Sequence, residues 1–220
     1  MNLPLPLQFV NLLAAALLLI AFALLSQRRI VGLITLFAWQ GLALTLSTTL
    51  VALYTRQPHL LTSAALTLLL KVIVLPWIFF RLVRRLDMER DVEPVINIPT
   101  TMLIGIVLVI FAFNLAQPIS ALAGTVTRST LGIAMAVVLI SFLTMITRRQ
   151  AIAQVIGFLA MENGLFFAAT SATYGMPLVV ELGIALDVLV GVFVLVIFFF
   201  QIRETFESLD LRHLERLKER

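Results

Sequence analysis

The stretch "QVIGFLAMENGLFFAAT" covers residues 154–170 and has the character of the middle of a membrane-spanning helix, yet Glu162 stands at its centre. A span needs about 20 predominantly apolar residues. A charged Asp, Lys or Arg at the centre of such a helix costs about 2.5–3.5 kcal/mol on insertion scales. Such residues usually face protein or water and mark ion paths. The stretch therefore predicts a membrane protein with a functional carboxylate.

The composition of the whole chain also indicates a membrane protein. Of its 220 residues, 61% are hydrophobic and only 13% are charged, and the mean hydropathy is +1.07. Soluble domains carry about 25% charged residues. The chain has no cysteine, which excludes disulfides, thiolate metal sites and cysteine nucleophiles. The arginines flank apolar runs instead of forming one basic face, so the net charge of +4 gives no prediction of nucleic-acid binding.

Seven apolar runs are long enough to cross a membrane, which predicts an all-α, polytopic membrane protein. They cover residues 5–26, 30–54, 60–83, 99–117, 127–147, 150–172 and 177–202. The first lacks the basic start of a signal peptide and leads directly into the second, so we expect it to be retained.

The basic residues predict the orientation of these runs. Only Arg56 and Arg128 fall on one side, and Lys71 lies within a run. The others flank the opposite side: Arg28, Arg29, Arg81, Arg84, Arg85, Arg90, Arg148, Arg149, Arg203, Arg212, Arg216, Lys218 and Arg220. We expect a bacterial or archaeal cell (inner) membrane, with the N-terminus outside and the C-terminus in the cytoplasm.

The two halves of the chain resemble each other, which indicates an internal repeat. "SQRRIVGLITLFAWQGL" (26–42) is similar to "TRRQAIAQVIGFLAMENGL" (147–165), and this alignment sets Gln40 opposite Glu162. A chance likeness between apolar helices is the alternative. The repeat predicts a parallel 3+1+3 arrangement. Its parts are a three-helix unit with a cytoplasmic loop (1–98), a linking helix (99–126), a second three-helix unit (127–202) and a cytoplasmic amphipathic tail (203–220).

Four ionisable residues lie within the predicted spans, at Lys71, Glu162, Glu181 and Asp187. With a rise of about 1.5 Å per residue, Glu162 and Asp187 lie about 20 and 24 Å from the cytoplasmic rim. Lys71 is about 15 Å in, and Glu181 is near the outer boundary at about 33 Å. We expect Glu162, Asp187 and Lys71 to form a proton path, or the carboxylates to pair structurally. Glu181 is a further candidate.

Other residues fit helix packing better than chemistry. Gly183 and Gly191 lie four residues before and four residues after Asp187. This spacing sets all three on one helical face, where the two glycines allow a neighbouring helix to approach closely. Gln40 and Asn163 are expected to form interhelical hydrogen bonds, and are further candidates for the path.

The last three runs resemble the K subunit of NADH–quinone oxidoreductase, a three-helix protein of the complex I membrane arm. That family has a basic pair before its second helix and a glutamate within it, matched here by Arg148-Arg149 and Glu162. A second glutamate in its third helix precedes a glycine by four residues, matched by Asp187 and Gly191. Aspartate replaces glutamate, and the separation of the two carboxylates is shorter than in that family.

The whole chain resembles hydrogenase-4 component E, the K-like subunit of formate hydrogenlyase-type and related group 4 membrane-bound hydrogenases. The resemblance implies a non-catalytic subunit among antiporter-like membrane subunits, an H-subunit-like membrane protein and a soluble hydrogenase arm. It implies that nickel–iron and iron–sulfur centres lie on these partners, with no cofactor or metal on this chain.

Two alternatives remain open. One is the C subunit of a multisubunit sodium/proton antiporter, which is also K-like but normally lacks the N-terminal extension and the tail. The other is a stand-alone small transporter with a 3+1+3 repeat. Transporters of that plan use prolines as hinges in several helices, whereas Pro76 is the only proline in the middle of a predicted span here.

Overall fold

The computed structural model describes residues 5–85, 94–122 and 127–173, together with Gly183, Val190, Gly191 and Phe193. These residues are almost entirely helical, which confirms the all-α prediction. The helices are α1 (Leu5–Ser26), α2 (Ile30–Thr55), α3 (Pro58–Thr67), η1 (Leu68–Val74), α4 (Leu75–Arg85), α5 (Ile98–Leu122), α6 (Thr127–Ile146) and α7 (Ala151–Thr173). They belong to one compact unit, residues 1–184, and residues 185–220 form a second.

Six of the seven predicted spans are present as helices, since α3, η1 and α4 follow one another without a break. In the described residues, five helices are long and apolar enough to cross a membrane, and Thr130–Ile146 is a shorter apolar helix. The chain is therefore a membrane protein. The seventh run lies largely, and the predicted tail entirely, outside the described residues. The repeat and the predicted domain boundaries stay predictions.

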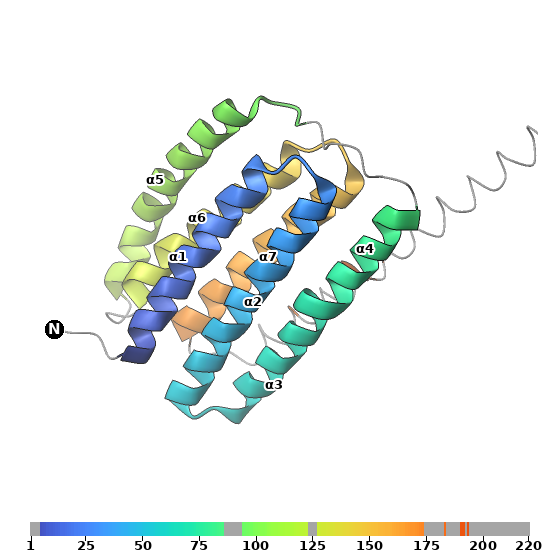
Figure 1. Ribbon diagram of the computed structural model, residues 1–220. Helices are drawn as coiled ribbons and strands as arrows, with labels where there is room; N and C mark the ends of the chain where they lie inside the picture. The colour runs from blue at the N-terminus through green and yellow to red at the C-terminus, as the bar shows by residue number, and fades with distance from the viewer. Residues whose placement is uncertain are drawn as a thin grey trace, which may run out of the picture. The chain divides into compact units, whose positions relative to one another are not determined.

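The helices of the first unit pack side by side around a shared core (Figure 1). α1 packs against α2 and α6, and α7 packs against α6 and α2. α5 packs against α6 and part of α1, while α3, η1 and α4 pack against α2. Small residues such as Ala14, Ala21, Ala43 and Ala134 lie in this core. They allow close approach of helix backbones, the usual means of association in membranes.

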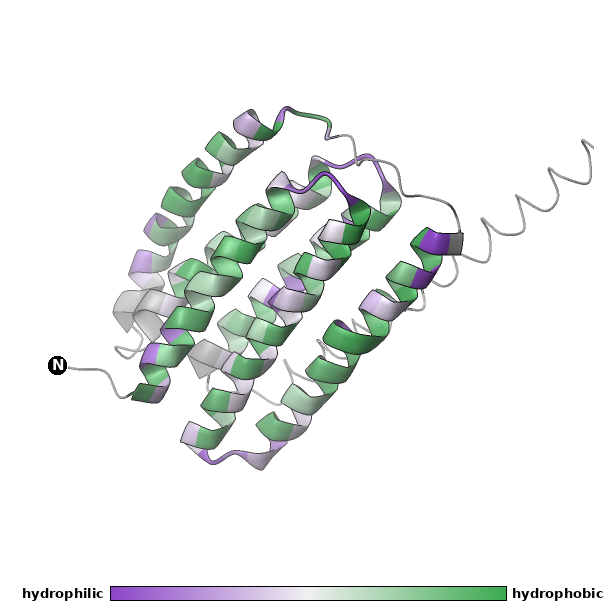
Figure 2. Cartoon of the chain, viewed as in Figure 1, coloured by the Kyte–Doolittle hydropathy of each residue, from purple (hydrophilic) through white to green (hydrophobic). Residues whose placement is uncertain are grey.

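Hydrophilic residues gather at the turns of this unit, and the helices between them are mainly apolar with scattered polar residues (Figure 2). The α1–α2 turn, the α6–α7 turn and the end of α4 lie at the same end of the unit (Figure 1). These three places carry Arg28-Arg29, Arg148-Arg149 and Arg84-Arg85. The gathering of the basic turns at one end agrees with the charge asymmetry of the sequence. Which side of the membrane this end faces stays a prediction.

The third span contains a π-helical segment, η1, where the sequence indicates only a proline in a helix. The backbone N–H of Leu75 donates to the carbonyl of Leu70, five residues earlier. Pro76 follows directly and has no N–H to return the chain to the α-helical pattern at this point. Short π-segments widen the helix and occur frequently at functional sites. Lys71 lies in the middle of this one.

Gly157 sets the separation of α6 and α7. A Cβ atom at this position would lie 2.9 Å from the backbone N and Cα of Met145. Because backbone cannot move aside without separating the helices, Gly157→Ala is expected to lower the free energy of unfolding by about 1–3 kcal/mol. Thermal unfolding of the purified protein in detergent measures this. Gly105→Ala is the matched control, since its nearest neighbours are the side-chain ends of Phe22 and Leu25, at 3.0 and 3.3 Å. Equal losses in both variants would contradict the inference.

Candidate functional site

Four predicted residues come together in a polar cluster between η1, α2 and α7. Lys71 Nζ lies 3.4 Å from Glu162 Oε1, forming an ion pair. The same ammonium donates a 2.8 Å hydrogen bond to Asn163 Oδ1. Asn163 Nδ2 in turn donates to Gln40 Oε1 at 3.2 Å. Hydrogen-bond donation therefore runs from Lys71 through Asn163 to Gln40.

The side chains of the cluster are almost completely buried. Gln40 and Asn163 have no exposed surface, while Lys71 and Glu162 are 1% and 5% exposed. Charges at this depth are retained only when they are paired and hydrogen-bonded. Lys71 therefore does not extend toward the membrane surface. Long basic side chains in membrane helices otherwise often do so. The side chain is held as a buried partner of Glu162.

Local sequence explains how the two charges meet. Glu162 and Asn163 are consecutive on α7, so one turn of helix presents both to the ammonium. On α2, Gly41 makes room for η1, since a Cβ there would lie 3.1 Å from the Cβ of Lys71. The Phe166 ring lies one turn beyond Glu162 and its centroid is 5.9 Å from Lys71 Nζ. An aromatic face at this distance is attractive to an ammonium.

The remaining predicted residues lie only partly within the described structure. A Cβ at Gly183 would lie 3.3 Å from the Phe166 ring and 3.5 Å from Glu162 Oε1. The glycine is therefore a close neighbour of the cluster, and its packing role stays a prediction. Asp187 and Glu181 lie outside the described residues. Gly191 belongs to the second unit, and its packing role stays a prediction.

Arg148 is a buried residue that sequence reasoning missed, because it reads as one of the flanking arginines. It is 1% exposed, and its Nη2 donates to the carbonyls of Leu25 at 2.7 Å and Leu24 at 3.3 Å. These carbonyls belong to the last turn of α1, where helix carbonyls lack intrahelical partners and a cation is favourable. Burial lowers the pKa of the Arg148 guanidinium. Arg148 thus fastens the α6–α7 turn to α1.

The turn at Arg148 also holds the chain that enters α5. The backbone N–H of Val95 donates to the carbonyl of Thr147 at 2.9 Å, and Pro94 pairs with Arg148 as an isolated bridge. On the other side, Gln154 Nε2 donates to the carbonyl of Arg148 at 2.8 Å. This end of the unit is therefore a structural clasp, distinct from the polar cluster within the helices.

The polar cluster brings a proton donor, the Lys71 ammonium, against a proton acceptor, the Glu162 carboxylate. An ammonium and a carboxylate at 3.4 Å can exist as an ion pair or, after transfer of one proton, as an amine and a carboxylic acid. In the described part of the chain, no three His, Cys, Asp or Glu side chains are placed to hold a metal ion.

Comparison with known proteins gives relatives that match nearly the full length. The chain is 34% identical over 211 residues to the uncharacterized protein Rv0085 of Mycobacterium tuberculosis, covering 96% of each chain. It is 26% identical over 183 residues to hydrogenase-4 component E of Escherichia coli and of Shigella flexneri, covering 83% of this chain and 84% of each relative. No family model matches the chain. No solved structure matches it either.

Proposed function

The chain belongs to the family of the Mycobacterium tuberculosis protein Rv0085, and because hydrogenase-4 component E is a more distant relative, we propose that it is a membrane subunit of a complex I-related hydrogenase. In this proposal the complex is of the group 4, formate hydrogenlyase type. The chain supplies buried titratable groups to a path that moves protons or sodium ions across the membrane. Redox chemistry belongs to a partner arm that holds nickel–iron and iron–sulfur centres.

The observation that carries this proposal is the buried ion pair of Lys71 and Glu162. A pair of this kind is weak evidence for stability, since well-packed apolar residues often serve as well or better. Ionisable residues inside membranes are instead associated with ion pathways and proton relays. The pair also has amide partners in line, because Asn163 links the ammonium to Gln40. These amides orient the ammonium and extend the buried polar region from η1 to α2.

The pair is also suited to respond to charge on a neighbouring subunit. Its two protonation states differ in dipole, so an ion that arrives nearby favours one state over the other. Lys71 lies on the π-helical segment, whose backbone pattern differs from that of the α-helices on either side. A change at this segment would move the ammonium relative to Glu162. Charge and geometry at the site are thereby coupled.

Asp187 is the proposed next group on the path, because it is the second carboxylate that the sequence places at a depth close to that of Glu162. It lies outside the described residues. Antiporter-like membrane subunits would take up the charge displacement on one side of this chain. An H-subunit-like protein and the soluble arm would deliver it on the other. From the distribution of basic residues, the N-terminus would lie outside and the C-terminus in the cytoplasm.

Purification of the tagged chain in a gentle detergent, followed by mass spectrometry of the proteins that come with it, tests this proposal. We expect antiporter-like subunits together with a nickel–iron hydrogenase arm. Antiporter-like subunits without any redox protein would overturn the hydrogenase assignment and favour the C subunit of a sodium/proton antiporter. A homo-oligomer alone would overturn membership of either complex and favour the stand-alone transporter.

A further inference from the structure

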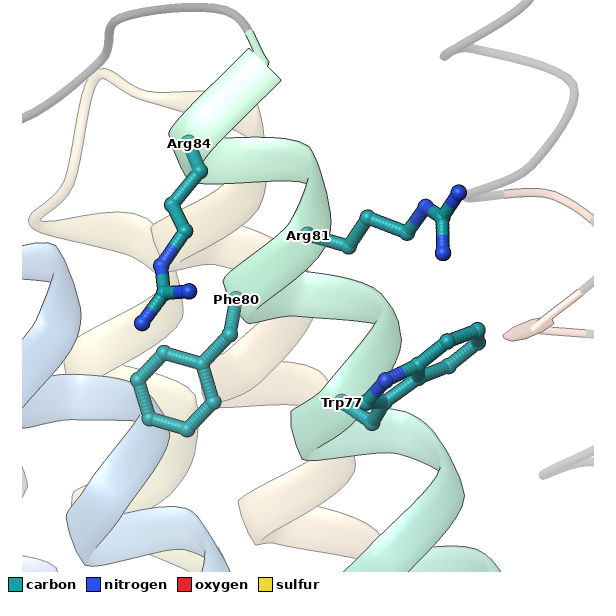
Figure 3. A pocket seen from close by; sticks show the side chains of 4 residues that line it. All are labelled: Trp77, Phe80, Arg81 and Arg84. Atoms are coloured by element: carbon teal, nitrogen blue, oxygen red, sulfur yellow. The ribbon is translucent and has the colours of Figure 1, made fainter.

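The outward face of α4 carries two aromatic and two basic side chains in a repeated pattern. Trp77 and Arg81 are four residues apart, and so are Phe80 and Arg84. The four side chains line a pocket of about 470 Å³. Figure 3 shows Arg81 beside Trp77 on one flank of the helix and Arg84 turned back toward Phe80 on the other. Each aromatic ring thus has a guanidinium one turn above it.

This face is turned away from the rest of the unit. The opposite face of α4 is buried through Leu75, Phe79, Leu82 and Val83, each at most 5% exposed. In contrast, Trp77 is 59% exposed, and Arg81 and Arg84 are both exposed. Because one face of α4 packs on the first unit and the other does not, the pocket opens away from that unit.

The pocket lies at the level of lipid headgroups. The span that contains it runs from Pro58 to Arg84, 27 residues, which is about 40 Å of helix against about 30 Å of hydrocarbon. With the excess shared between both ends, Arg84 extends into the headgroup region and Arg81 lies at its boundary. Trp77 and Phe80 lie just inside, where aromatic side chains gather in membrane proteins.

Within the described part of the chain, the two guanidinium groups are available to an anion. Among the described residues, Lys71 and Glu162 form an ion pair, whereas neither Arg81 nor Arg84 has an acidic partner within ion-pair distance. The Arg81 guanidinium lies 5.3 Å from the centroid of the Trp77 ring. Stacking of this kind holds the planar group in place while its N–H groups remain free to donate in the plane. A guanidinium held in this way can donate two parallel hydrogen bonds to the oxygens of one phosphate.

We propose that this pocket, formed by Trp77, Phe80, Arg81 and Arg84, binds the headgroup of an anionic phospholipid. The phosphate accepts hydrogen bonds from Arg81, which lies over Trp77, and Arg84 on the other flank adds positive charge, while the glycerol and upper acyl carbons rest on Trp77 and Phe80. Basic pockets at the ends of membrane helices bind anionic lipid headgroups in this way. The aromatic rings favour a lipid over an acidic protein segment, because they extend the site into the hydrocarbon, which an acidic peptide does not enter.

Native mass spectrometry of the delipidated, detergent-purified chain, titrated with phosphatidylglycerol or with phosphatidylcholine, tests this site. We expect the wild type to retain phosphatidylglycerol and the Arg81→Gln/Arg84→Gln double variant to bind it about 10- to 30-fold more weakly. Trp77→Leu is expected to weaken binding while leaving the preference for the anionic lipid. The control is Arg28→Gln/Arg29→Gln, which removes the same charge from exposed residues of the α1–α2 turn and should bind as the wild type does.

Two results would overturn the assignment. The first is equal retention of phosphatidylglycerol by the wild type and the Arg81→Gln/Arg84→Gln variant, or an equal loss in the control pair. The second is a loss of co-purifying proteins from that variant with lipid binding unchanged, which would make the face a protein contact. Neither result depends on the Lys71–Glu162 pair, so this inference and the proposed function can fail separately.

Discussion

Glu162→Gln and Lys71→Met are each expected to lower the free energy of unfolding by about 3–5 kcal/mol, and the double variant is expected to recover most of that loss. Either single change removes one member of a buried ion pair. The ammonium would keep its hydrogen bond to Asn163, so Glu162→Gln should be the milder of the two. The double variant removes both charges and leaves side chains of similar volume in the same packed space.

A double-mutant cycle on the purified protein in detergent measures this coupling by thermal unfolding. Arg149→Gln serves as the reference for loss of a single charge, since Arg149 is exposed, and it is expected to change stability by less than about 0.5 kcal/mol. The interaction term of the cycle should be several times larger than that. Additive effects of Lys71→Met and Glu162→Gln would mean that the pair at 3.4 Å makes no energetic contact in the native protein.

The sequence predicts the helices better than it predicts their contacts. Apolar run length placed α1 and α2 to within one residue of their ends, because hydrogen bonding within the helix and the thickness of the bilayer decide both bounds. The π-helical segment around Lys71 could not be predicted in this way. Pro76 indicates a disturbance of the backbone, but whether it appears as a kink or as a π-segment depends on packing against Gly41 and its neighbours.

In the site too, the sequence predicts the depth of the residues but not the contacts between them. Depth estimates set Lys71 and Glu162 within about 5 Å of each other along the membrane normal, which agrees with their pairing. Depth alone cannot say which helix faces which, and the matched depth of Asp187 made that residue the expected companion of Glu162. Asn163 shares a turn with Glu162, yet its position between Lys71 and Gln40 follows only from the packing of α2 against α7. The sequence does not reveal the role of Arg148 for a related reason, since an exposed flanking arginine and a buried arginine that binds a helix end have the same sequence pattern.

The largest functional effect is expected from the Lys71→Met/Glu162→Gln variant in the assembled complex. With both titratable groups removed and the helices still packed, ion translocation should fall by about 100-fold, the lower end of what positioned proton-transfer groups contribute. Hydrogenase turnover should persist, because the redox centres are proposed to lie on partner subunits. The measurement is ion uptake per electron pair in inverted membrane vesicles, with a pH-sensitive dye and with and without sodium.

The double variant separates chemistry from assembly, which single variants cannot do. A single variant that fails to pump could have lost its fold, since removal of one member of a buried ion pair destabilises the chain. If the restored double variant assembles, turns over and still fails to translocate ions, the pair acts in the path itself. Asn163→Leu should give a smaller loss, because it interrupts the hydrogen bonds to Lys71 and Gln40 but leaves both titratable groups in place. Full translocation by the double variant would show instead that Lys71 and Glu162 only hold η1 against α7.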